Sequence, residues 1–451
     1  MVSRLSSIVK AYDIRGLVPD ELDDALARDL GAAFVRFLDA DRIVTAYDMR
    51  ESSPGLAAAF AEGATAQGAD VVAAGLGSTD LLYFAAGTLG VPGAMFTASH
   101  NPARYNGIKL CRAGAAPVGM DSGLAEIRDL AESGVPDRDG PPGTVTHREL
   151  LGDYAAYLLG LVPGVREARR LRVVVDAGNG MAGLTVPKVF ESLPVDLTPM
   201  YFELDGSFPN HEANPIDPAN LRDLQAAVRE HGADLGLAFD GDADRCFVVD
   251  ERGEVVSPSA LTALIAHREL AREPGATVIH NLITSHAVPE IVREHGGVPV
   301  RTRVGHSFIK ATMAETGAVF GGEHSGHFYF RDFWRADSGM LAALHVLAAL
   351  GSTDRPLSEL LASYERYVGS GEINSEVSDP AAALAAVKAA FASRPGVRAD
   401  ELDGLTVDIE GDGWFNVRPS NTEPLLRLNV EAADRAAMEK LRDDVLAVIR
   451  A

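Results

Sequence analysis

The stretch Met95–Leu110, MFTASHNPARYNGIKL, runs from an apolar segment straight into a loop of reactive side chains. Residues 94–96 form a short apolar run, which predicts the end of a buried strand. The loop then brings a hydroxyl at Ser99, an imidazole at His100 and an amine at Lys109. Its Asn-Pro and Asn-Gly pairs are also typical of a plain turn-rich surface loop. A potential nucleophile, a proton-transfer group and a cation together favour a functional loop, although Ser99 lacks the G-x-S-x-G setting of an acyl-transfer serine.

On both sides of this loop, short apolar runs alternate with stretches rich in Ala and Leu. This alternation predicts βα units with mostly parallel sheets. The expected strands are residues 43–47, 71–74, 94–97, 171–175, 235–239, 277–280, 298–302 and 318–320. Ser53 is expected to cap a helix that has Pro54 at its first position. The segment 137–147, DRDGPPGTVTH, has the composition of a linker between domains.

The C-terminal part has a different pattern. Residues 405–409, 414–417 and 426–430 predict three strands, and a helix is expected from about Ala433. Since little helix separates these strands, we expect them to pair antiparallel. The fold class is therefore α/β, with three similar α/β domains that have mixed sheets and a smaller C-terminal α+β domain. The expected boundaries are 1–145, 146–253, 254–368 and 369–451.

Composition narrows the class of protein. A chain of 451 residues with 47% hydrophobic and 23% charged residues is typical of a folded protein of several domains. The net charge of −23 argues against a nucleic-acid or anionic-membrane surface. Neither a membrane span nor a signal peptide is expected, because no apolar run is long enough and the N-terminus has no cleavage pattern. With only two cysteines, a reducing cytoplasm is the expected location.

A second loop, DGDADR, follows the strand expected at 235–239. Asp240, Asp242 and Asp244 stand at alternate positions, so their carboxylates can converge on one hard cation such as Mg²⁺. Without a cation they would repel one another and raise one another's pKa. Arg245 occupies the position where an EF-hand needs glycine, and strand-like residues follow it, so we reject an EF-hand. A haloacid-dehalogenase phosphatase loop and a solvated acidic turn remain as alternatives.

Two more loops combine donors and acceptors. GGEHSGH, Gly321–His327, places Glu323 and Ser325 where they could bind vicinal sugar hydroxyls. A polar turn is the alternative, and a metal site at His324 and His327 would need a third ligand that the nearby sequence lacks.

RPSNTEP, Arg418–Pro424, lies between two expected strands of the last domain. Its arginine supplies a bidentate fork for phosphate, and its Ser, Asn and Thr add short donors. A β-turn explains the Pro, Ser and Asn, whereas a phosphate-binding loop also explains Arg418.

TASHNPARYNGIK, DGDADR, GEHSGH and RPSNTEP, in this order and spacing, resemble the four signature loops of the α-D-phosphohexomutases. The resemblance is strongest to the phosphomannomutase/phosphoglucomutase branch. It covers essentially the whole chain, including KAYDIRG (Lys10–Gly16) and RYVGSGEINSEV (Arg366–Val377). It implies four domains around a central cleft, three α/β domains and one smaller C-terminal domain.

The resemblance also implies a role for each matching residue. Ser99 would be phosphorylated in the resting enzyme, and a phosphoryl oxygen on it would join Asp240, Asp242 and Asp244 in holding Mg²⁺. Lys109 and Arg245 would lie beside the transferring group, and His100 or Lys109 could move a proton. The implied substrate-binding residues are Glu323 and Ser325 for the sugar hydroxyls, Arg418, Ser420, Asn421 and Thr422 for the phosphate that does not react, and Tyr12, Arg15, His306 and His327 along the cleft.

The implied reaction interconverts hexose 1-phosphate and hexose 6-phosphate, of mannose and also of glucose, through a phosphoserine and a hexose 1,6-bisphosphate. The expected partner is a hexose phosphate, with no nucleic acid and no membrane, and the expected assembly is a monomer or a homodimer. Since the serine and the phosphate-binding loop lie in the first and last domains, domain closure is expected to exclude water.

Two alternatives remain open. The first is a phosphoglucosamine mutase, although His324 stands where that branch usually carries Gln. The second is a non-catalytic sugar-phosphate-binding protein, which the presence of Ser99, Lys109 and all three aspartates argues against. The chain also departs from the pattern at HNLITSH, His280–His286, where some relatives carry a lysine and this chain has none.

Overall fold

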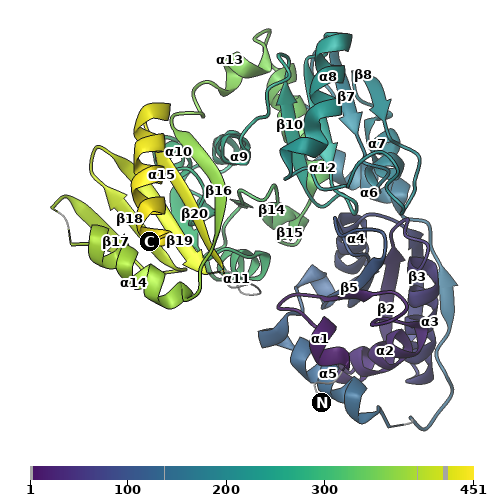
Figure 1. The fold of residues 1–451 in the computed structure, drawn as a ribbon. Helices are drawn as coiled ribbons and strands as arrows, with labels where there is room; N and C mark the ends of the chain where they lie inside the picture. Colours follow the sequence, from purple (N-terminus) through teal and green to yellow (C-terminus); the bar gives the residue numbers. More distant parts are fainter. Residues whose placement is uncertain (1–3, 137, 394, 420–424) are drawn as a thin grey trace. The chain divides into compact units, whose positions relative to one another are not determined.

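The computed structural model describes residues 4–136, 138–393, 395–419 and 425–451 (Figure 1). The chain divides into two units, which are described separately: residues 1–256 with 325–360, and residues 257–324 with 361–451. Within the described ranges, no helix combines the length and the apolar character needed to cross a bilayer.

The first unit begins with a mixed six-stranded sheet in the order β1-β5-β4-β2-β3-β6. Neighbours from β4 to β6 pair parallel, whereas β5 runs antiparallel to both β4 and β1. The strands are β1 Ile14–Leu17, β2 Arg42–Tyr47, β3 Asp70–Leu76, β4 Gly93–Phe96, β5 Tyr105–Cys111 and β6 Val145–His147. The helices are α1 Arg4–Ile8, α2 Asp24–Leu38, α3 Ser53–Ala66, α4 Thr79–Leu89 and α5 Leu124–Ser133, with 3₁₀ turns at Ala113–Ala115 and Met120–Ser122.

Two glycines allow α2 and α3 to pack with their backbones in contact. A Cβ built on Gly31 in α2 would lie 2.1 Å from the carbonyl oxygen of Phe60 in α3. A Cβ built on Gly63 in α3 would lie 1.9 Å from the carbonyl oxygen of Arg28 in α2. Both distances are shorter than any real contact, so only glycine permits this approach.

The second sheet of the first unit has the order β10-β9-β7-β8. β7 pairs parallel with β8 and β9, and β10 turns back antiparallel against β9. The strands are β7 Leu171–Asp176, β8 Val195–Met200, β9 Leu235–Phe239 and β10 Cys246–Asp250. The helices are α6 Leu151–Leu161, α7 Ala182–Phe190 and α8 Arg222–His231, with a 3₁₀ turn at Pro218–Leu221. The turn between β9 and β10 is the DGDADR loop.

The first unit also contains an antiparallel strand pair and a buried helix from later in the chain. These are β14 Phe328–Phe330, a 3₁₀ turn at Arg331–Phe333, β15 Ala336–Asp337 and α12 Gly339–Gly351. α13, Leu357–Leu361, lies where the chain passes to the second unit.

The second unit contains three parallel strands in the order β12-β11-β13 and a C-terminal antiparallel sheet. Its first elements are β11 Thr277–Asn281, β12 Val298–Thr302, β13 Phe320–Gly322, α9 Pro258–Arg272, α10 Ala287–Glu294 and α11 His306–Thr316. The C-terminal sheet has the order β16-β20-β19-β18-β17, and all its pairs are antiparallel. Its elements are β16 Val368–Glu376, β17 Val397–Asp400, β18 Leu405–Ile409, β19 Gly413–Pro419, β20 Leu425–Ala432, α14 Pro380–Phe391 and α15 Arg435–Ile449.

The fold class expected from the sequence is confirmed: α/β domains with mixed sheets precede a smaller antiparallel C-terminal domain (Figure 1). The strands expected at 235–239, 298–302 and 405–409 coincide with β9, β12 and β18. The antiparallel pairing expected at the C-terminus is also confirmed. The central cleft stays a prediction.

Two local expectations are wrong, the N-cap of α3 and the start of the strand at 318–320. The N-cap of α3 is Ser52 rather than Ser53, since the hydroxyl of Ser53 donates to the buried carboxylate of Asp48 at 2.6 Å. The expected linker at 137–147 stays a prediction, and its last three residues form β6, which pairs with β3. The strand expected at 318–320 begins only at Phe320.

Replacing Gly63 by Ala should lower the free energy of unfolding by about 2 kcal/mol, the usual cost of overpacking a rigid contact. Gly55→Ala in the same helix is the matched control, because its Cβ would meet nothing nearer than 3.5 Å. Urea denaturation followed by circular dichroism measures both changes. Equal stability of the two variants would contradict the packing described for α2 and α3.

Candidate active site

The loop between β4 and β5 carries Ser99 in an unusual backbone conformation. Ser99 is buried and has φ +51°, in the left-handed region that L-residues other than glycine rarely occupy. Its backbone N–H donates to Oγ1 of Thr97 at 2.9 Å. A strained non-glycine residue is retained only where the surroundings hold it, so this loop is fixed from outside.

The acidic loop between β9 and β10 packs directly against the Ser99 loop. A Cβ on Gly241 would lie 2.4 Å from the carbonyl oxygen of Ser99, so the two backbones are in contact. On the other side, a Cβ on Gly180 would lie 2.6 Å from the carbonyl oxygen of Gly241. Three loops from two sheets are therefore stacked backbone on backbone, and glycine at 180 and 241 makes the stacking possible.

This packing brings the Ser99 hydroxyl onto the first aspartate. Ser99 Oγ donates to Asp240 Oδ2 at 2.8 Å, and Arg245 Nε donates to the same oxygen at 2.8 Å. Burial raises the pKa of Asp240 to about 7; the charge of Arg245 opposes this shift, and Asp244 and Asp242 add to it.

His100 lies beside the hydroxyl, with Nδ1 at 3.3 Å from Ser99 Oγ. Arg245 Nη2 lies 2.6 Å from the same nitrogen. A guanidinium has no acceptor, so His100 Nδ1 accepts this bond and the imidazole is neutral with its proton on Nε2. Burial, together with the charges of Arg245 and Arg15, lowers the pKa of His100 to about 2.

Lys109, on β5, joins the other two aspartates. Its Nζ donates to Asp242 Oδ2 and to Asp244 Oδ2, both at 2.6 Å. Burial would lower the pKa of Lys109, but the two carboxylates raise it well above its usual value. Burial likewise opposes ionisation of Asp244, yet Lys109 and His327 hold its pKa at about 2. The lysine is therefore a fixed cation.

The three aspartates fit a hard divalent cation. One carboxylate oxygen from each lies within 4.8 Å of the others. Asp242 Oδ1 and Asp244 Oδ1 are buried and, within the described residues, accept no hydrogen bond. A second group, Asp244, His327 and Asp337, meets the same distance limit. Mg²⁺ prefers oxygen ligands, which favours the all-carboxylate group for that ion.

Arg15 and His327 also lie at this site in the first unit. Arg15 Nη1 donates to Asn101 Oδ1 in the Ser99 loop at 2.6 Å, and its Nε donates to Asp13 at 2.8 Å. His327 Nε2 lies 3.6 Å from Asp244 Oδ1, and its Nδ1 lies 2.9 Å from the hydroxyl of Ser325. Tyr12 directly precedes the Asp13–Arg15 segment and is half-buried.

The remaining predicted residues belong to the second unit. Glu323 Oε1 accepts bonds from Asn281 Nδ2 at 3.3 Å and from the backbone N–H of Gly305 at 3.2 Å. His306 is the first residue of α11. The GEHSGH motif is therefore shared, with Glu323 in the second unit and Ser325 in the first.

Arg418, on β19, is buried and donates from Nη2 to Glu372. Its Nη1 has no hydrogen-bond partner within the described residues. Ser420, Asn421 and Thr422 lie outside the described residues.

The sequence interpretation missed three residues that contact these loops. Thr79, at the start of α4, donates from Oγ1 to Asp242 Oδ2 at 2.6 Å. Asn281 contacts Glu323 from HNLITSH, the stretch already noted for its missing lysine. Arg50 binds the backbone of the Ser99 loop and nothing in its local sequence distinguishes it from a surface arginine.

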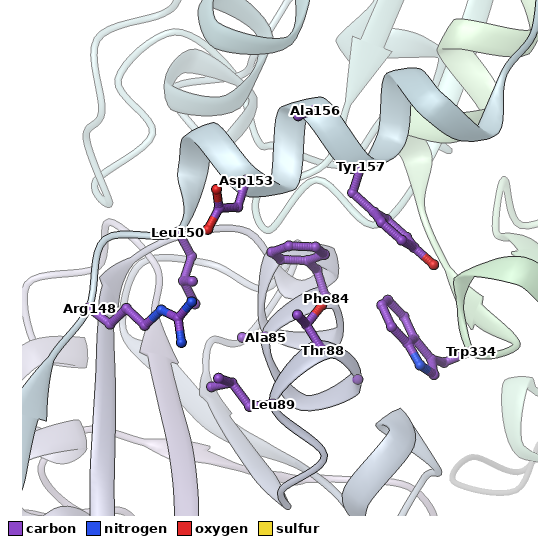
Figure 2. A pocket seen from close by; sticks show the side chains of 11 residues that line it. Phe84, Ala85, Thr88, Leu89, Arg148, Leu150, Asp153, Ala156, Tyr157 and Trp334 are labelled. Carbon is purple, nitrogen blue, oxygen red and sulfur yellow. The ribbon is translucent and has the colours of Figure 1, made fainter.

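A cavity of about 550 Å³ lies elsewhere in the first unit (Figure 2). Phe84 and Leu89 of α4 line it together with Arg148, Tyr157 and Trp334. The rings of Tyr157 and Trp334 are stacked with their centroids 5.1 Å apart. None of the predicted site residues lines this cavity, so the candidate site is the cluster around Ser99 and the acidic loop.

Family models and full-length relatives both match this chain to the same family of sugar-phosphate mutases. Models of the phosphoglucomutase/phosphomannomutase family match all four domains: α/β/α domain I at residues 6–135, domain II at 153–253, domain III at 257–367 and the C-terminal domain at 372–448. The chain is 42% identical to a protein of Xanthomonas campestris pv. campestris named "Phosphohexose mutases" over 437 residues, 96% of each chain. It is 40% identical to the phosphomannomutase of Escherichia coli strain K12 over 450 residues, 97% of each chain.

A solved structure agrees with these matches. The crystal structure of a phosphoglucomutase/phosphomannomutase family protein from Burkholderia thailandensis superimposes with a TM-score of 0.89 at 34% identity, covering 100% of this chain and 98% of that one. The chain therefore belongs to the phosphoglucomutase/phosphomannomutase family of phosphohexomutases, and it is a mutase enzyme.

Proposed function

We propose that this enzyme interconverts the 1-phosphate and the 6-phosphate of mannose, and also of glucose, through a phosphorylated Ser99 and a hexose 1,6-bisphosphate. The observation that carries the proposal is the contact of Ser99 Oγ with Asp240, inside a buried cluster that also contains Lys109 and Arg245. A serine placed among carboxylates and fixed cations suits phosphoryl transfer, whose catalysis is mostly positioning and charge stabilisation.

Charge supports a divalent cation at this site. Three aspartates face two cations, Lys109 and Arg245, so the cluster has a net charge of about −1. A phosphoryl group on Ser99 would add roughly two negative charges. Mg²⁺ held by Asp240, Asp242, Asp244 and the phosphoryl group would neutralise the charge of the phosphoryl oxygens. Asp242 Oδ1 and Asp244 Oδ1, which accept no hydrogen bond from the described residues, support these ligands.

Lys109 and Arg245 are proposed to stabilise the charge that spreads over the transferring group. Both are hydrogen-bonded to the metal-binding carboxylates, which fixes their ammonium and guanidinium groups before the substrate binds. His100 lies beside the hydroxyl, and we keep it with Lys109 as a candidate for proton transfer; Lys109 is a cation, so it could act there only as a proton donor. Because Arg245 occupies His100 Nδ1, that nitrogen can take a proton only after Arg245 moves.

The sugar and its distal phosphate are assigned to the other loops. Glu323 and Ser325 would bind the hydroxyls of the sugar, with Tyr12, Arg15, His306 and His327 as further contacts. Arg418, with Ser420, Asn421 and Thr422, would bind the phosphate that does not react. The buried Nη1 of Arg418, which has no acceptor within the described residues, supports an anion there.

The intermediate is proposed to turn over between two half-reactions. The phosphoryl group of Ser99 passes to one sugar hydroxyl, and the other phosphate of the bisphosphate then returns to Ser99. The Arg418 loop must therefore accept a phosphate with the sugar in either direction. We also propose a cytoplasmic location and four domains, with boundaries after residues 145, 253 and 368.

Ser99→Ala should lower kcat by at least about a thousandfold, because the covalent acceptor is lost. Peptide mass spectrometry should find a phosphoryl group on Ser99 in the purified enzyme. Ser133→Ala, an exposed serine of α5, is the control and should keep full activity. An active Ser99→Ala variant would rule out the proposed function.

Asp242→Asn should weaken Mg²⁺ binding at least about tenfold, because one of the three ligands loses its charge. Calorimetric titration of Mg²⁺ into the unphosphorylated enzyme measures this without turnover. Asp337→Asn tests the other candidate group and should leave the affinity within about threefold of the parent, because Asp337 is not a ligand in the all-carboxylate group. The reverse ranking would place the ion at Asp244, His327 and Asp337 instead.

The substrate assignment predicts similar kcat/KM values for mannose and glucose 1-phosphates and a value at least about tenfold lower for glucosamine 1-phosphate. Mannose and glucose differ in the orientation of one hydroxyl, whereas glucosamine carries an amine. Parallel assays with the three substrates decide among them. Preference for glucosamine phosphate would identify the sister mutase, and binding of all three without turnover would identify a non-catalytic protein.

A further inference from the structure

Arg50 is a buried arginine whose side chain faces the Ser99 loop. It follows β2, and only 2% of its surface is exposed. Burying a guanidinium requires nearly complete hydrogen bonding, because an unpaired buried charge is very unfavourable. The partners of Arg50 therefore show what the arginine holds in place.

All five N–H groups of this guanidinium have acceptors. Nη2 donates to the carbonyl oxygens of Ser99 at 2.9 Å and Asn101 at 2.7 Å. Nη1 donates to those of Pro102 at 3.1 Å and Tyr105 at 3.0 Å. Nε donates to Asp48 at 3.2 Å. Four of the five acceptors are thus backbone carbonyls: three in the loop that carries Ser99, and the fourth at Tyr105, where β5 begins.

Backbone hydrogen bonds within this segment reach only part of these carbonyls: that of Pro102 also accepts the backbone N–H of Tyr105 at 3.0 Å. The segment between β4 and β5 leaves the sheet at Phe96 and rejoins it at Tyr105. Backbone carbonyls buried between strands need donors, and Arg50 supplies four of them at once. One side chain therefore links four backbone carbonyls of this segment to one fixed point.

The arginine is itself fixed from two sides. Asp48 accepts from its Nε and from its backbone N–H at 3.0 Å, and also binds the hydroxyl of Ser53. The ring of Phe208 lies 5.1 Å from the guanidinium carbon. A charged group held by a carboxylate and covered by an aromatic ring has one orientation.

We propose that Arg50 is a positioning residue for phosphoryl transfer: it holds the Ser99 loop in the left-handed conformation that places Ser99 Oγ on Asp240. The inference rests on the proposed role of Ser99 as the phosphorylated residue. Arg50 acts through the backbone of the loop, because its contacts are with carbonyl oxygens rather than with the hydroxyl. The geometry requires five donors in one plane, which a lysine with three donors cannot supply.

Arg50→Lys is the decisive variant, because it keeps the positive charge and loses the planar set of five N–H donors. We expect kcat to fall at least about tenfold with KM for the hexose phosphate within about threefold. Hydrogen exchange of the backbone amides in residues 98–105 should rise about tenfold, while β2 and β7 stay protected. Phosphorylation of Ser99 by glucose 1,6-bisphosphate, followed by intact mass, should slow by the same factor as kcat.

Phe34→Leu is the matched control for general destabilisation. Phe34 is buried in the same domain and packs on Phe60 at a ring distance of 5.8 Å, and it is not a hydrogen-bond partner of the Ser99 loop. It should lower Tm and leave kcat within about threefold of the parent. An equal fall in kcat in both variants at matched loss of Tm would overturn the positioning role.

A second variant covers the case in which Arg50→Lys does not fold. Phe208→Leu uncovers the guanidinium at a half-buried position and should raise exchange in residues 98–105 and lower kcat about threefold. Unchanged exchange and unchanged kcat would overturn the inference. If Ser99→Ala is inactive and Arg50→Lys keeps its kcat, only the positioning role fails. If Ser99→Ala is active, the proposed function fails with it.

Discussion

The structure of the candidate site depends on balancing charges that have been removed from water. Asp240, Asp242 and Asp244 are almost fully buried within one short turn. Such a group is tolerated only if cations lie close by, and Lys109 and Arg245 meet this need from β5 and from the turn itself. The charge balance also depends on packing, because Lys109 comes from β5 and reaches Asp242 and Asp244 only when the first sheet packs against the β9–β10 turn. Gly180 and Gly241 allow the backbones of these loops to come into contact, and the guanidinium of Arg50 holds the Ser99 loop in place.

The sequence was sufficient to predict those strands and loops that have a distinctive local pattern of residues. The apolar run at residues 235–239, bounded by turns, located β9 to the residue, and all five of its residues are buried. β12 was also located to the residue, although its first residue, Val298, is exposed. The loops at their ends were also found, since metal-binding and phosphate-binding chemistry needs particular side chains at close spacing. β16 escaped notice because most of its residues are exposed or half-exposed and carry no alternating apolar face.

Features that depend on contacts between distant parts of the chain could not be predicted from local sequence pattern. The N-cap of α3 is Ser52, and the hydroxyl of the next residue, Ser53, donates to the Asp48 carboxylate instead. The partners of Arg50 lie about fifty residues further along the chain, and carbonyl oxygens have no signature in sequence. The resemblance named the residues expected to touch substrate, whereas Arg50 and Thr79 became visible only through contacts made by the folded chain.

The backbone contact between Gly241 and Ser99 has a consequence for how such a protein can diverge. The hydroxyl at position 99 points away from that contact toward Asp240, so its loss would delete one reacting group and leave the stacked loops intact. Any side chain at position 241 would instead push the acidic loop and the Ser99 loop apart, and would separate Ser99 from the three aspartates. A relative that loses the present chemistry could therefore replace its nucleophile by one substitution and keep the packing of the loops, whereas a substitution of Gly241 would disturb that packing.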